Sequence, residues 1–539
     1  MVVAFFQIVA ADIDGTLTSR GELSDQVLDA LDQARNNGVL IVLVTGRIGS
    51  ELMAEFPQLA DHADALVLEN GAVAMLNGEL VRLAPPVDVV LDGALTAHGV
   101  TFRRGEVLLA TDGEHATAVV ESIGQLGLDC QIIRNRDAVM VLPAEVTKGS
   151  GLRALLSRMN RSPHNVIAVG DAENDVSMLL VAELGVAVAN AIPSVVAHAD
   201  EVLQLPDGAG VAGLLTGPLL SGARRYCPIR RWIDIGSFGD KTPTKVPGSQ
   251  GRIVVTGPSG SGKSHVIGLM AERWILAGYS VLVVDPEGDH SQLKELDNVV
   301  LVDSRHYLPE PGELVEMLHP NTSMVVDLSA LEVPHKGDYV HRLRFAAEAH
   351  REAHGFPHWV IYDEAHLLGP QEEARWVRRG GYVLSSYVHA ELPADEVSDS
   401  DVILEMGPDR WASIRVAGGE PKPFTPDRRR TLHIRHRHKY AQVALPKERR
   451  FYFRSSGGQS LPPAATMPEF RAAVSRLDPE ALEFHLERGD FARWLDRIVS
   501  DKELAVDVAS WEDELAAHRA AEVERIRHRI VRAVDERYS

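Results

Sequence analysis

Short apolar runs that end in acidic or hydroxyl residues recur along the first part of the chain. Residues 8–12 (IVAAD), 39–45 (VLIVLVT) and 166–171 (VIAVGD) are three of them. Each run is too short for a core helix and is rich in β-branched residues, which is typical of strands buried on both faces. Residues 24–37, between the first two runs, have helical spacing. Strands that alternate with helices in this way predict a doubly wound α/β sheet.

The same pattern resumes later in the chain and then stops. Apolar runs at residues 252–256, 279–285, 324–328 and 358–364 predict a second α/β domain with a largely parallel sheet. From about residue 466 onward, the apolar positions follow helical spacing only. We therefore expect an all-α module at the C-terminal end.

These patterns divide the chain, because 539 residues are too many for one domain. Within the first domain, residues 83–144 alternate between strand and helix patterns of their own and predict a small α/β cap. The predicted organisation is a first domain at 1–213 with its cap at about 83–144, a linker at 214–250, a second domain at 251–435, and a basic connector with a helical module at 436–539.

Composition narrows the classes of protein. The net charge is −21, and residues 1–213 carry 28 acidic against 12 basic residues, which argues against a nucleic-acid surface on the first domain. Two cysteines, Cys130 and Cys227, do not support a disulfide framework or a zinc site, so we expect a reducing, cytoplasmic compartment. The N-terminus lacks a basic region before its apolar residues, and no apolar run reaches 18 residues; we predict neither a signal peptide nor a membrane span.

Two carboxylates follow the first strand at its carboxyl end. Asp12 and Asp14 stand one residue apart, just before a Gly-Thr pair. Ligands bind at this edge of an open α/β sheet, and two adjacent acids repel each other unless a cation lies between them. Taken alone, Asp12 is equally well explained as a helix-capping residue. The later segments supply the partners that a phosphoryl site needs, namely Thr45, Lys148, Asp171 and Asp175.

The order DxDGT, Thr, Lys, GDxxND resembles the haloacid dehalogenase superfamily, in the branch whose cap lies between the Thr and Lys motifs, as in Cof-type and phosphoglycolate-phosphatase-like members. The resemblance covers residues 1–213 and implies a Mg²⁺-dependent phosphatase that acts on a small phosphate ester through an aspartyl-phosphate. It implies these roles: Asp12 as nucleophile, Asp14 as general acid and base, Thr45 and Lys148 on the phosphoryl oxygens, Asp175 orienting Lys148, Asn174 completing the motif, and Mg²⁺ between Asp12, the Asp14 carbonyl oxygen and Asp171.

A cap of this kind excludes water and limits substrate size, so it favours a small phosphate ester over a DNA end or a phosphoprotein. Four arginines lie in the cap segments and either recognise substrate anions or form a solvated surface: Arg103, Arg104, Arg134 and Arg136.

The second chemical centre is a glycine-rich loop between a strand and a helical pattern. It fits G-x-x-x-x-G-K-S in the context that this motif requires, and it predicts ATP binding. Its residues are Gly257, Pro258, Ser259, Gly260, Ser261, Gly262, Lys263 and Ser264. Lys263 would reach the β- and γ-phosphates, and Ser264 would bind Mg²⁺.

An acid pair ends a later strand of the same domain. Asp363 and Glu364 read as a Walker B site, in which Asp363 holds Mg²⁺ through water and Glu364 polarises the attacking water. An acid pair at a helix N-terminus is the plainer alternative.

GPSGSGKS, VLVVDPEGDH and DEAH together resemble the HerA/FtsK-like P-loop ATPases. Ser385-Ser386 replaces the Thr-Gln pair that senses the γ-phosphate in that family, which puts motor-type hydrolysis in doubt. The family implies a homo-oligomeric ring, such as a hexamer, in which arginine fingers act across subunits. The candidates for such fingers are Arg378, Arg379 and Arg410, although an ordinary surface arginine is the plainer interpretation of each.

Two C-terminal features stay open. Residues 428–439 (RRRTLHIRHRHK) hold six Arg or Lys residues, three His and no acid; they either contact nucleic-acid phosphates or dock on an acidic surface. The stripe formed by Leu515, Val523, Ile526, Ile530 and Val534 predicts either an oligomerisation helix or a helix packed on its own module.

The sequence therefore favours a two-site enzyme without a membrane segment, a HAD-type hydrolase fused to a HerA/FtsK-like ATPase. The first alternative is a nucleic-acid end-processing kinase/phosphatase, which shares the order of the two domains. The second is a nucleotide-gated assembly switch that controls the phosphatase.

Overall fold

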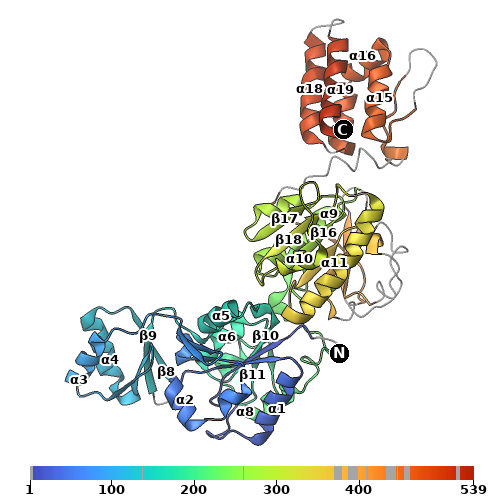
Figure 1. Ribbon diagram of the computed structural model, residues 1–539. Coiled ribbons are helices and arrows are strands. Elements are labelled where there is room, and N and C mark those ends of the chain that lie inside the picture. The colour runs from blue at the N-terminus through green and yellow to red at the C-terminus, as the bar shows by residue number, and fades with distance from the viewer. Residues whose placement is uncertain are drawn as a thin grey trace.

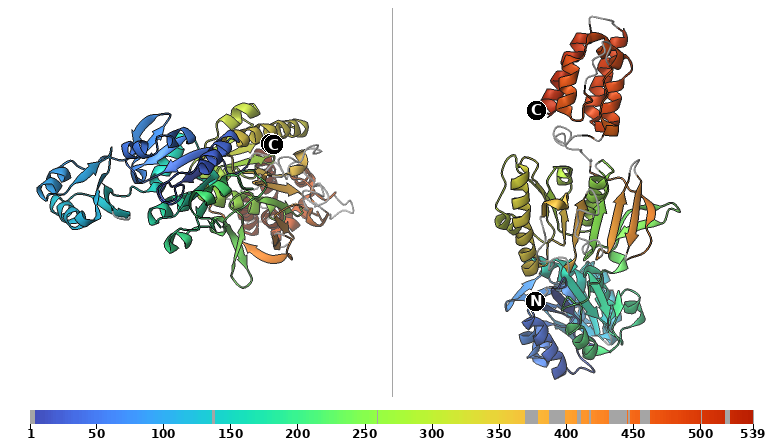
Figure 2. Two further views of the ribbon diagram at one scale, coloured as in Figure 1. Left: turned by 90° about the horizontal axis from the view of Figure 1, so that it is seen from below. Right: turned by 90° about the vertical axis from the view of Figure 1, so that its right-hand side faces the viewer.

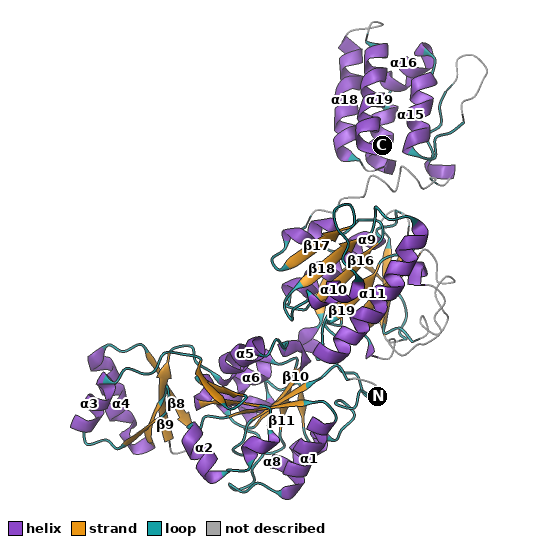
Figure 3. Cartoon of the chain, in the orientation of Figure 1, coloured by secondary structure: helices purple, strands orange, loops and turns teal. Residues whose placement is uncertain are grey.

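Two α/β parts and one helical part follow one another along the chain (Figures 1 and 3). The computed structural model describes residues 4–135, 138–258, 260–368, 379–386, 399–407, 411–416, 418–431, 445, 447–454, 462–499, 501–517 and 522–538. The predicted fold class is confirmed: a doubly wound sheet with a cap, a second α/β sheet and C-terminal helices.

The first sheet has eight strands in the order β12-β11-β10-β1-β2-β3-β4-β5. Its strands are β1 (Ile8–Ala11), β2 (Leu40–Val44), β3 (Ala65–Leu68), β4 (Val73–Leu76), β5 (Glu79–Arg82), β10 (Val166–Gly170), β11 (Leu184–Ala187) and β12 (Glu201–Val202). The helices around it are α1 (Asp25–Asn36), α2 (Gly49–Glu55), α5 (Lys148–Arg158), α6 (Val176–Val181), α7 (Pro193–Val196) and α8 (Asp207–Leu215). All pairs from β12 to β3 are parallel, and β1 lies between β10 and β2.

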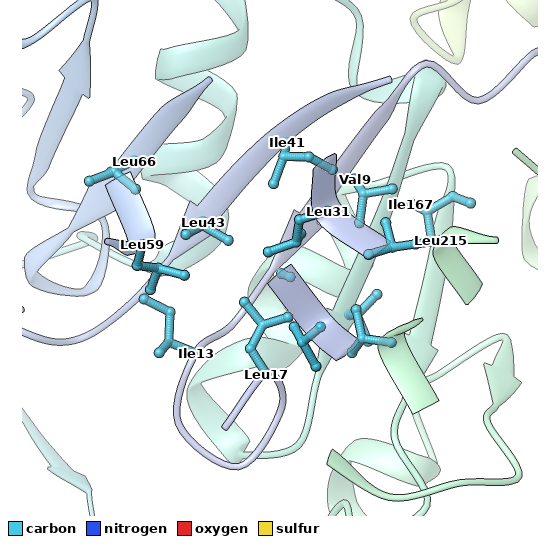
Figure 4. Packing of buried hydrophobic residues seen from close by; sticks show 14 of the residues in the cluster. Val9, Ile13, Leu17, Leu31, Ile41, Leu43, Leu59, Leu66, Ile167 and Leu215 are labelled. Atoms are coloured by element: carbon cyan, nitrogen blue, oxygen red, sulfur yellow. The ribbon is translucent and has the colours of Figure 1, made fainter. Parts of the chain in front are cut away.

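Both faces of this sheet are covered, as the continuous apolar runs predict. Figure 4 shows one face, where Leu31 of α1 and Leu215 of α8 pack among Val9, Ile41 and Ile167. Leu152 of α5 and Met178 of α6 belong to the core on the opposite face. The active edge of the sheet is thus held by a rigid, fully apolar framework.

The predicted cap forms a separate small layer with its own sheet, beside the first sheet (Figures 1 and 2). Its four antiparallel strands are β6 (Phe102–Arg104), β7 (Leu109–Asp112), β8 (Cys130–Asn135) and β9 (Ala138–Pro143), in the order β6-β7-β9-β8. The helices α3 (Val90–Ala97) and α4 (Ala116–Leu126) close the cap core.

The second sheet has eleven strands in the order β14-β13-β23-β22-β21-β15-β20-β19-β16-β18-β17. The parallel strands are β15 (Arg252–Thr256), β16 (Val281–Asp285), β17 (Val299–Asp303), β18 (Ser323–Asp327), β19 (Trp359–Tyr362), β20 (Tyr382–Ser386) and β21 (Val402–Met406). The antiparallel edge is β22 (Ala412–Val416), β23 (Lys422–Pro426), β13 (Ile233–Phe238) and β14 (Pro243–Val246). Helices α9 (Lys263–Leu276), α10 (Pro311–Glu316) and α11 (Val333–His354) cover the parallel part. β13 and β14 lie within residues 214–250, so part of the predicted linker belongs to the edge of this sheet.

The helical part has its own aromatic core. It contains α15 (Met467–Arg476), α16 (Pro479–Glu487), α17 (Asp490–Trp494) with a π turn after it, α18 (Lys502–Ala517) and α19 (Val523–Tyr538). The five residues of the predicted apolar stripe are all buried in this core. The structure thus decides between the two alternatives: the stripe packs within its own module, and it offers no exposed face for oligomerisation.

A buried seam joins the first two parts at the starts of their strands. Gln7, just before β1, donates from Nε2 to the carbonyl oxygens of Arg351 (3.2 Å) and Glu352 (3.0 Å) at the end of α11. Asn165, just before β10, donates from Nδ2 to the carbonyl oxygen of Gly355 (3.1 Å). The contact of α11 with the first part is visible in Figure 1.

Arg379 also lies at this seam. It is buried and donates to the Arg351 carbonyl oxygen at 2.8 Å. Both interpretations of Arg379, as an arginine finger and as a surface arginine, are therefore wrong, because its side chain is buried at the opposite end of the sheet from the glycine-rich loop. Arg378 and Arg410 lie outside the described residues.

One buried carboxylate holds three segments of the seam together. Glu183 accepts hydrogen bonds from Ser249 Oγ (2.5 Å) and Tyr279 OH (3.0 Å) and lies 2.8 Å from His164 Nδ1. The His164 ring also stacks on Tyr279, with 3.7 Å between centroids. Burial raises the pKa of Glu183, but the hydrogen bonds and the charges of His164 and Arg231 outweigh it, and the net shift is downward.

We expect Glu183→Ala to lower the free energy of unfolding by about 3 kcal/mol, because it leaves buried donors without their acceptor. Urea unfolding measures this loss. The pKa of Glu183 is depressed in the folded protein, so its contribution is present above its ordinary pKa of about 4.3 and is lost as the pH falls below that value. Glu22→Ala, at an exposed position, is the matched control; equal losses for the two variants would contradict the role of Glu183 in the seam.

Candidate functional site

The acids predicted at the strand ends come together at one edge of the first sheet. Asp12 directly follows β1, Asp171 directly follows β10, and Asp175 ends the short 3-10 turn after it. Their carboxylate oxygens lie within 4.8 Å of one another. Asp12 and Asp175 are buried, and Asp171 lines an open cavity.

Lys148 lies between two of these carboxylates. It is the first residue of α5, whose N-terminus Thr147 caps with its hydroxyl. Lys148 Nζ donates to Asp12 Oδ1 at 2.5 Å and to Asp175 Oδ1 at 2.6 Å, and the side chain is buried. Burial lowers the pKa of Lys148, but the two carboxylates outweigh this and keep it raised, so the ammonium stays charged.

Asp175 also shapes the turn that carries Asp171. Its second oxygen accepts hydrogen bonds from the backbone N–H groups of Asp171 and Ala172, each at 2.9 Å. A Cβ at Gly170 would lie 2.4 Å from the Asp175 Cβ, so only glycine fits there. Thr16 donates from its hydroxyl to Asp171 Oδ1 at 3.0 Å and fixes that carboxylate from the other side.

The charges of this edge fit a divalent cation. Burial, followed by the charge of Asp175, raises the pKa of Asp12 despite the opposing effect of Lys148. Three carboxylates thus share one ammonium group, and oxygen ligands are those that Mg²⁺ prefers. Asp12 and Asp171 offer carboxylate oxygens to such an ion.

Arg47 is a residue of this site that the sequence analysis missed. It follows Thr45-Gly46 after β2 and donates to both oxygens of Asp14, at 2.7 and 2.8 Å. It also pairs with Glu55 of α2. The hydrogen bonds with Asp14 raise the pKa of Arg47. The sequence signal that could have indicated Arg47 was its position two residues after the predicted Thr45.

Thr45 itself is buried at the end of β2, where its Oγ accepts a hydrogen bond from the Arg47 N–H at 3.2 Å. Asn174 donates from Nδ2 to Asn70 Oδ1 at 3.0 Å, which links the GDxxND motif to the turn after β3. The two residues therefore frame the acidic edge from opposite sides.

A cavity of about 1300 Å³ opens between this edge and the cap. Asp12, Asp14, Lys148 and Asp171 line its floor, and Ile132, Ile133, Met140, Arg103 and Arg134 line its cap side. Arg103 also pairs with Glu51 at 3.0 Å, whereas Arg104 pairs with Asp92 of the cap itself at 2.7 Å. Arg136 lies outside the described residues.

A buried carboxylate fixes the cap on the core. Glu69 accepts hydrogen bonds from the backbone N–H groups of Glu106, Val107 and Leu108 at 2.7, 2.8 and 2.9 Å. A Cβ at Gly105 would collide with this carboxylate. The cap side of the cavity is thus held in register with its catalytic floor.

The glycine-rich loop lies at the carboxyl end of β15, just before α9. Gly257, Gly260 and Gly262 have positive φ angles, which L-residues rarely adopt. Lys263 Nζ donates to the carbonyl oxygens of Gly257 (2.7 Å) and Pro258 (3.3 Å). Ser259 lies outside the described residues.

An acid outside the predicted set holds the loop serine. Ser264 donates from Oγ to Asp289 Oδ2 at 2.8 Å. Asp289 belongs to the turn after β16, which Asp285 organises by accepting hydrogen bonds from Gly288, Asp289 and His290. Burial raises the pKa of Asp285 to about 7, with His290 opposing this and Asp289 adding to it.

The predicted acid pair lies beside this turn. Asp363, one residue after β19, accepts a hydrogen bond from Ser385 Oγ at 2.5 Å and lies 2.9 Å from His290 Nε2. Glu364 donates from its backbone to Ser385 Oγ at 3.2 Å. Ligand atoms of Asp285, His290 and Asp363 lie within 4.8 Å of one another, which fits a cation site.

Ser385 thus contacts the acid pair from the strand where the family has Thr-Gln. Asp289, His290 and Ser385 were named in their motifs, but not as site residues. Their roles depend on how three strand ends meet, which a motif alone does not specify.

Models of two known families match stretches of the two α/β parts. A model of haloacid dehalogenase-like hydrolases matches residues 9–86 and 105–215. A model of the central domain of helicase HerA matches residues 250–350. No described helix has the length and apolarity needed to cross a membrane.

Single proteins resemble the first part. A phosphoglycolate phosphatase from Methanothermobacter thermautotrophicus is 34% identical over 214 residues, covering 38% of this chain and 95% of its own. The phosphoglycolate phosphatase from Archaeoglobus fulgidus is 31% identical over 219 residues, covering 38% and 94%. A solved haloacid dehalogenase-like hydrolase from Bacteroides thetaiotaomicron aligns at 20% identity with a TM-score of 0.35, covering 39% of this chain and 98% of that one.

Motif order, the acidic edge with its lysine, the two family models and the phosphoglycolate phosphatase relatives agree on one conclusion. Through its first 215 residues the chain belongs to the haloacid dehalogenase-like hydrolases, in the Cof-type and phosphoglycolate-phosphatase-like branch, and a HerA-type central domain follows them.

Proposed function

We propose that the first part hydrolyses a small phosphate monoester, with Asp12 as nucleophile. The observation that carries the proposal is the buried Asp12–Lys148–Asp175 group on the floor of a capped cavity. Asp12 and Asp171, with the Asp14 carbonyl oxygen, would hold Mg²⁺, which neutralises charge on the phosphoryl group when bound.

In the first step, an Asp12 carboxylate oxygen attacks phosphorus and the ester P–O bond breaks. The Asp14 carboxyl group gives its proton to the leaving oxygen, so the alcohol departs neutral. Lys148 and Thr45 bind the phosphoryl oxygens, and Asp175 keeps Lys148 in place. Arg47 holds the Asp14 side chain at the cavity wall through two hydrogen bonds.

In the second step, Asp14 takes a proton from water, and the water oxygen attacks the phosphorus of the aspartyl-phosphate. The bond to Asp12 breaks, which releases phosphate and restores the Asp12 carboxylate. The cap limits access of bulk water and of large substrates during both steps.

The substrate class follows from the cavity and from the relatives. The cavity has apolar walls from Ile132, Ile133 and Met140 and cationic groups from Arg103 and Arg134. Two of the relatives are named phosphoglycolate phosphatases, whose named substrate carries a carboxylate beside its phosphate. A small phosphorylated acid is therefore the substrate class that we propose.

Asp12→Asn should reduce phosphatase turnover at least about 1000-fold, because the amide cannot form an acyl phosphate. Phosphate release from phosphoglycolate and from p-nitrophenyl phosphate measures it. Asp29→Asn, an exposed residue of α1, is the control and should keep wild-type rates. If Asp12→Asn stayed within about tenfold of wild type, Asp12 would not be the nucleophile.

Millimolar Mg²⁺ should raise the thermal midpoint of the first part by about 3 °C, because a ligand that binds only the folded state stabilises it. Chelation should reverse the shift, and Asp171→Asn should remove it. Glu173→Gln, two residues away and exposed, should keep it. An unchanged shift in Asp171→Asn would place the ion elsewhere. Differential scanning fluorimetry reports all four results.

For the second part we propose ATP binding and hydrolysis at the glycine-rich loop. Gly257 to Ser264 would bind the phosphates, Ser264 and Asp363 would hold Mg²⁺, and Glu364 would polarise the attacking water. The support is the geometry of the loop beside the acid pair, together with the match to the HerA central domain.

The two alternatives keep definite tests. A kinase would label a 5′-hydroxyl oligonucleotide, and an assembly switch would bind ATP without steady turnover. Residues 429–431 of the basic segment pack beside α9, and residues 432–439 lie outside the described residues. The homo-oligomeric ring stays a prediction.

Lys263→Ala should weaken ATP binding at least about 100-fold, since the ammonium group that reaches the phosphates is lost. Phosphatase rates on small esters should stay within about twofold of wild type, because the two sites lie at opposite ends of their strands from the seam. Lys294→Ala, at an exposed position, is the control. Isothermal calorimetry with a non-hydrolysable analogue measures binding, and wild-type affinity in Lys263→Ala would reject the loop assignment.

A further inference from the structure

The chain crosses one face of the Walker A helix α9 just after it leaves the second sheet. We call residues 427–431, directly after β23, the strap. His265 Nε2 lies 3.0 Å from the Asp427 carbonyl oxygen. The buried Glu272 carboxylate accepts hydrogen bonds from the backbone N–H groups of Arg430 and Thr431, each at 2.9 Å. His265 and Glu272 lie on one face of the helix, so the strap is fixed along that face.

A glycine in the middle of α9 makes room for one side chain of the strap. A Cβ at Gly268 would lie 2.2 Å from Arg429 Nη1 and 2.5 Å from its Cζ. Gly268 has an ordinary helical backbone, so its conformation does not require glycine, and glycine is a poor helix former. Thr431 Oγ accepts hydrogen bonds from Arg429 Nε (3.2 Å) and Nη2 (3.0 Å) and holds the guanidinium in this place.

The guanidinium packs against the Walker A helix at Gly268. Burial lowers the pKa of Arg429 on balance, against the charges of Glu272, Asp289 and Asp285, which raise it. Asp289 is the carboxylate that holds Ser264, and Ser264 lies one turn before Gly268 on the same face of α9. The cation therefore lies one helical turn after the serine that Asp289 holds.

We propose that Arg429 is a positioning residue of the nucleotide site, a fixed cation that offsets the Asp285 and Asp289 carboxylates, and that Gly268 serves to admit it. Four carboxylates, those of Asp285, Asp289, Asp363 and Glu364, end beside the loop, and the phosphates of a nucleotide would add further negative charge there. A cation that acts through Asp289 lowers this repulsion and leaves Ser264 correctly placed.

The inference rests on the proposed ATP binding of the second part. Gly268 lies about 7 Å along the helix axis from Lys263, at 1.5 Å per residue. At an effective dielectric constant of about 20, a unit charge roughly 10 Å away changes affinity by about tenfold. We therefore expect a measurable effect on binding, although Arg429 does not belong to the glycine-rich loop.

The experiment compares affinities for a non-hydrolysable Mg·ATP analogue in full-length variants by calorimetry. Arg429→Met should bind about tenfold more weakly, and Arg429→Lys should recover most of the loss. Gly268→Ala keeps every charge and improves helix propensity, yet it should weaken binding about as much, because the new methyl group displaces the guanidinium. The double variant should be no weaker than Arg429→Met alone. Arg430→Met removes the same charge from the exposed neighbouring residue and should bind like wild type.

Near-ultraviolet circular dichroism, measured on each preparation, shows that the second part is folded. Binding in Arg429→Met or Gly268→Ala within twofold of wild type overturns the proposal, as does equal weakening by Arg430→Met. Lys263→Ala distinguishes failure of the proposed ATP binding from failure of this inference. If Lys263→Ala binds the analogue like wild type, the nucleotide site itself is misassigned. If Lys263→Ala loses binding while Arg429→Met binds like wild type, only the inference about Arg429 is overturned.

Discussion

The buried carboxylate of Glu183 sets the relation between the two α/β parts, because it contacts side chains from three separate stretches of the chain. His164 comes from the turn before β10 in the first part. Ser249 comes from the loop between β14 and β15, and Tyr279 from the residues just before β16, both in the second part. A buried charge is tolerated only when its partners are in place, so these segments must meet in one arrangement. Gln7 and Asn165 extend the seam along the strand starts.

This seam determines where the chemistry lies. The strands β1 and β19 both begin at the seam and end in their acids, Asp12 and Asp363. From Gln7 to Asp12, and from His358 to Asp363, each strand covers about 17 Å at about 3.3 Å per residue. The two acidic edges therefore face away from each other, and a phosphoryl group has no direct path between them. Any communication between the sites must pass through the strands and the seam.

Both edges manage buried negative charge in the same physical way. In the phosphatase site, Lys148 lies between Asp12 and Asp175, and the acid Asp14 is held by Arg47. In the nucleotide site, Asp363 is held by His290 and Ser385. In each case the partner comes from a different segment than the acid, so folding is needed to assemble a site that the strand end only begins. The two sites also leave carboxylate oxygens in excess of cations, which fits bound Mg²⁺.

The sequence by itself determined the elements and the primary acids, because strand periodicity and the glycine-rich loop are local properties of the chain. Asp12, Asp171 and Asp363 follow their strands as predicted, and Lys148 begins α5 beside Asp12. An oligomerisation helix and a helix packed in its own module show the same apolar periodicity. Only the tertiary structure therefore decided that the stripe from Leu515 to Val534 is buried in its own module. Arg379 was interpreted from the sequence as a surface residue or an arginine finger, and only packing shows that it is buried in the seam. The roles of Arg47, Glu183, Asp289 and Arg429 could not be assigned from the sequence, since they depend on partners that only folding brings within hydrogen-bonding or electrostatic range.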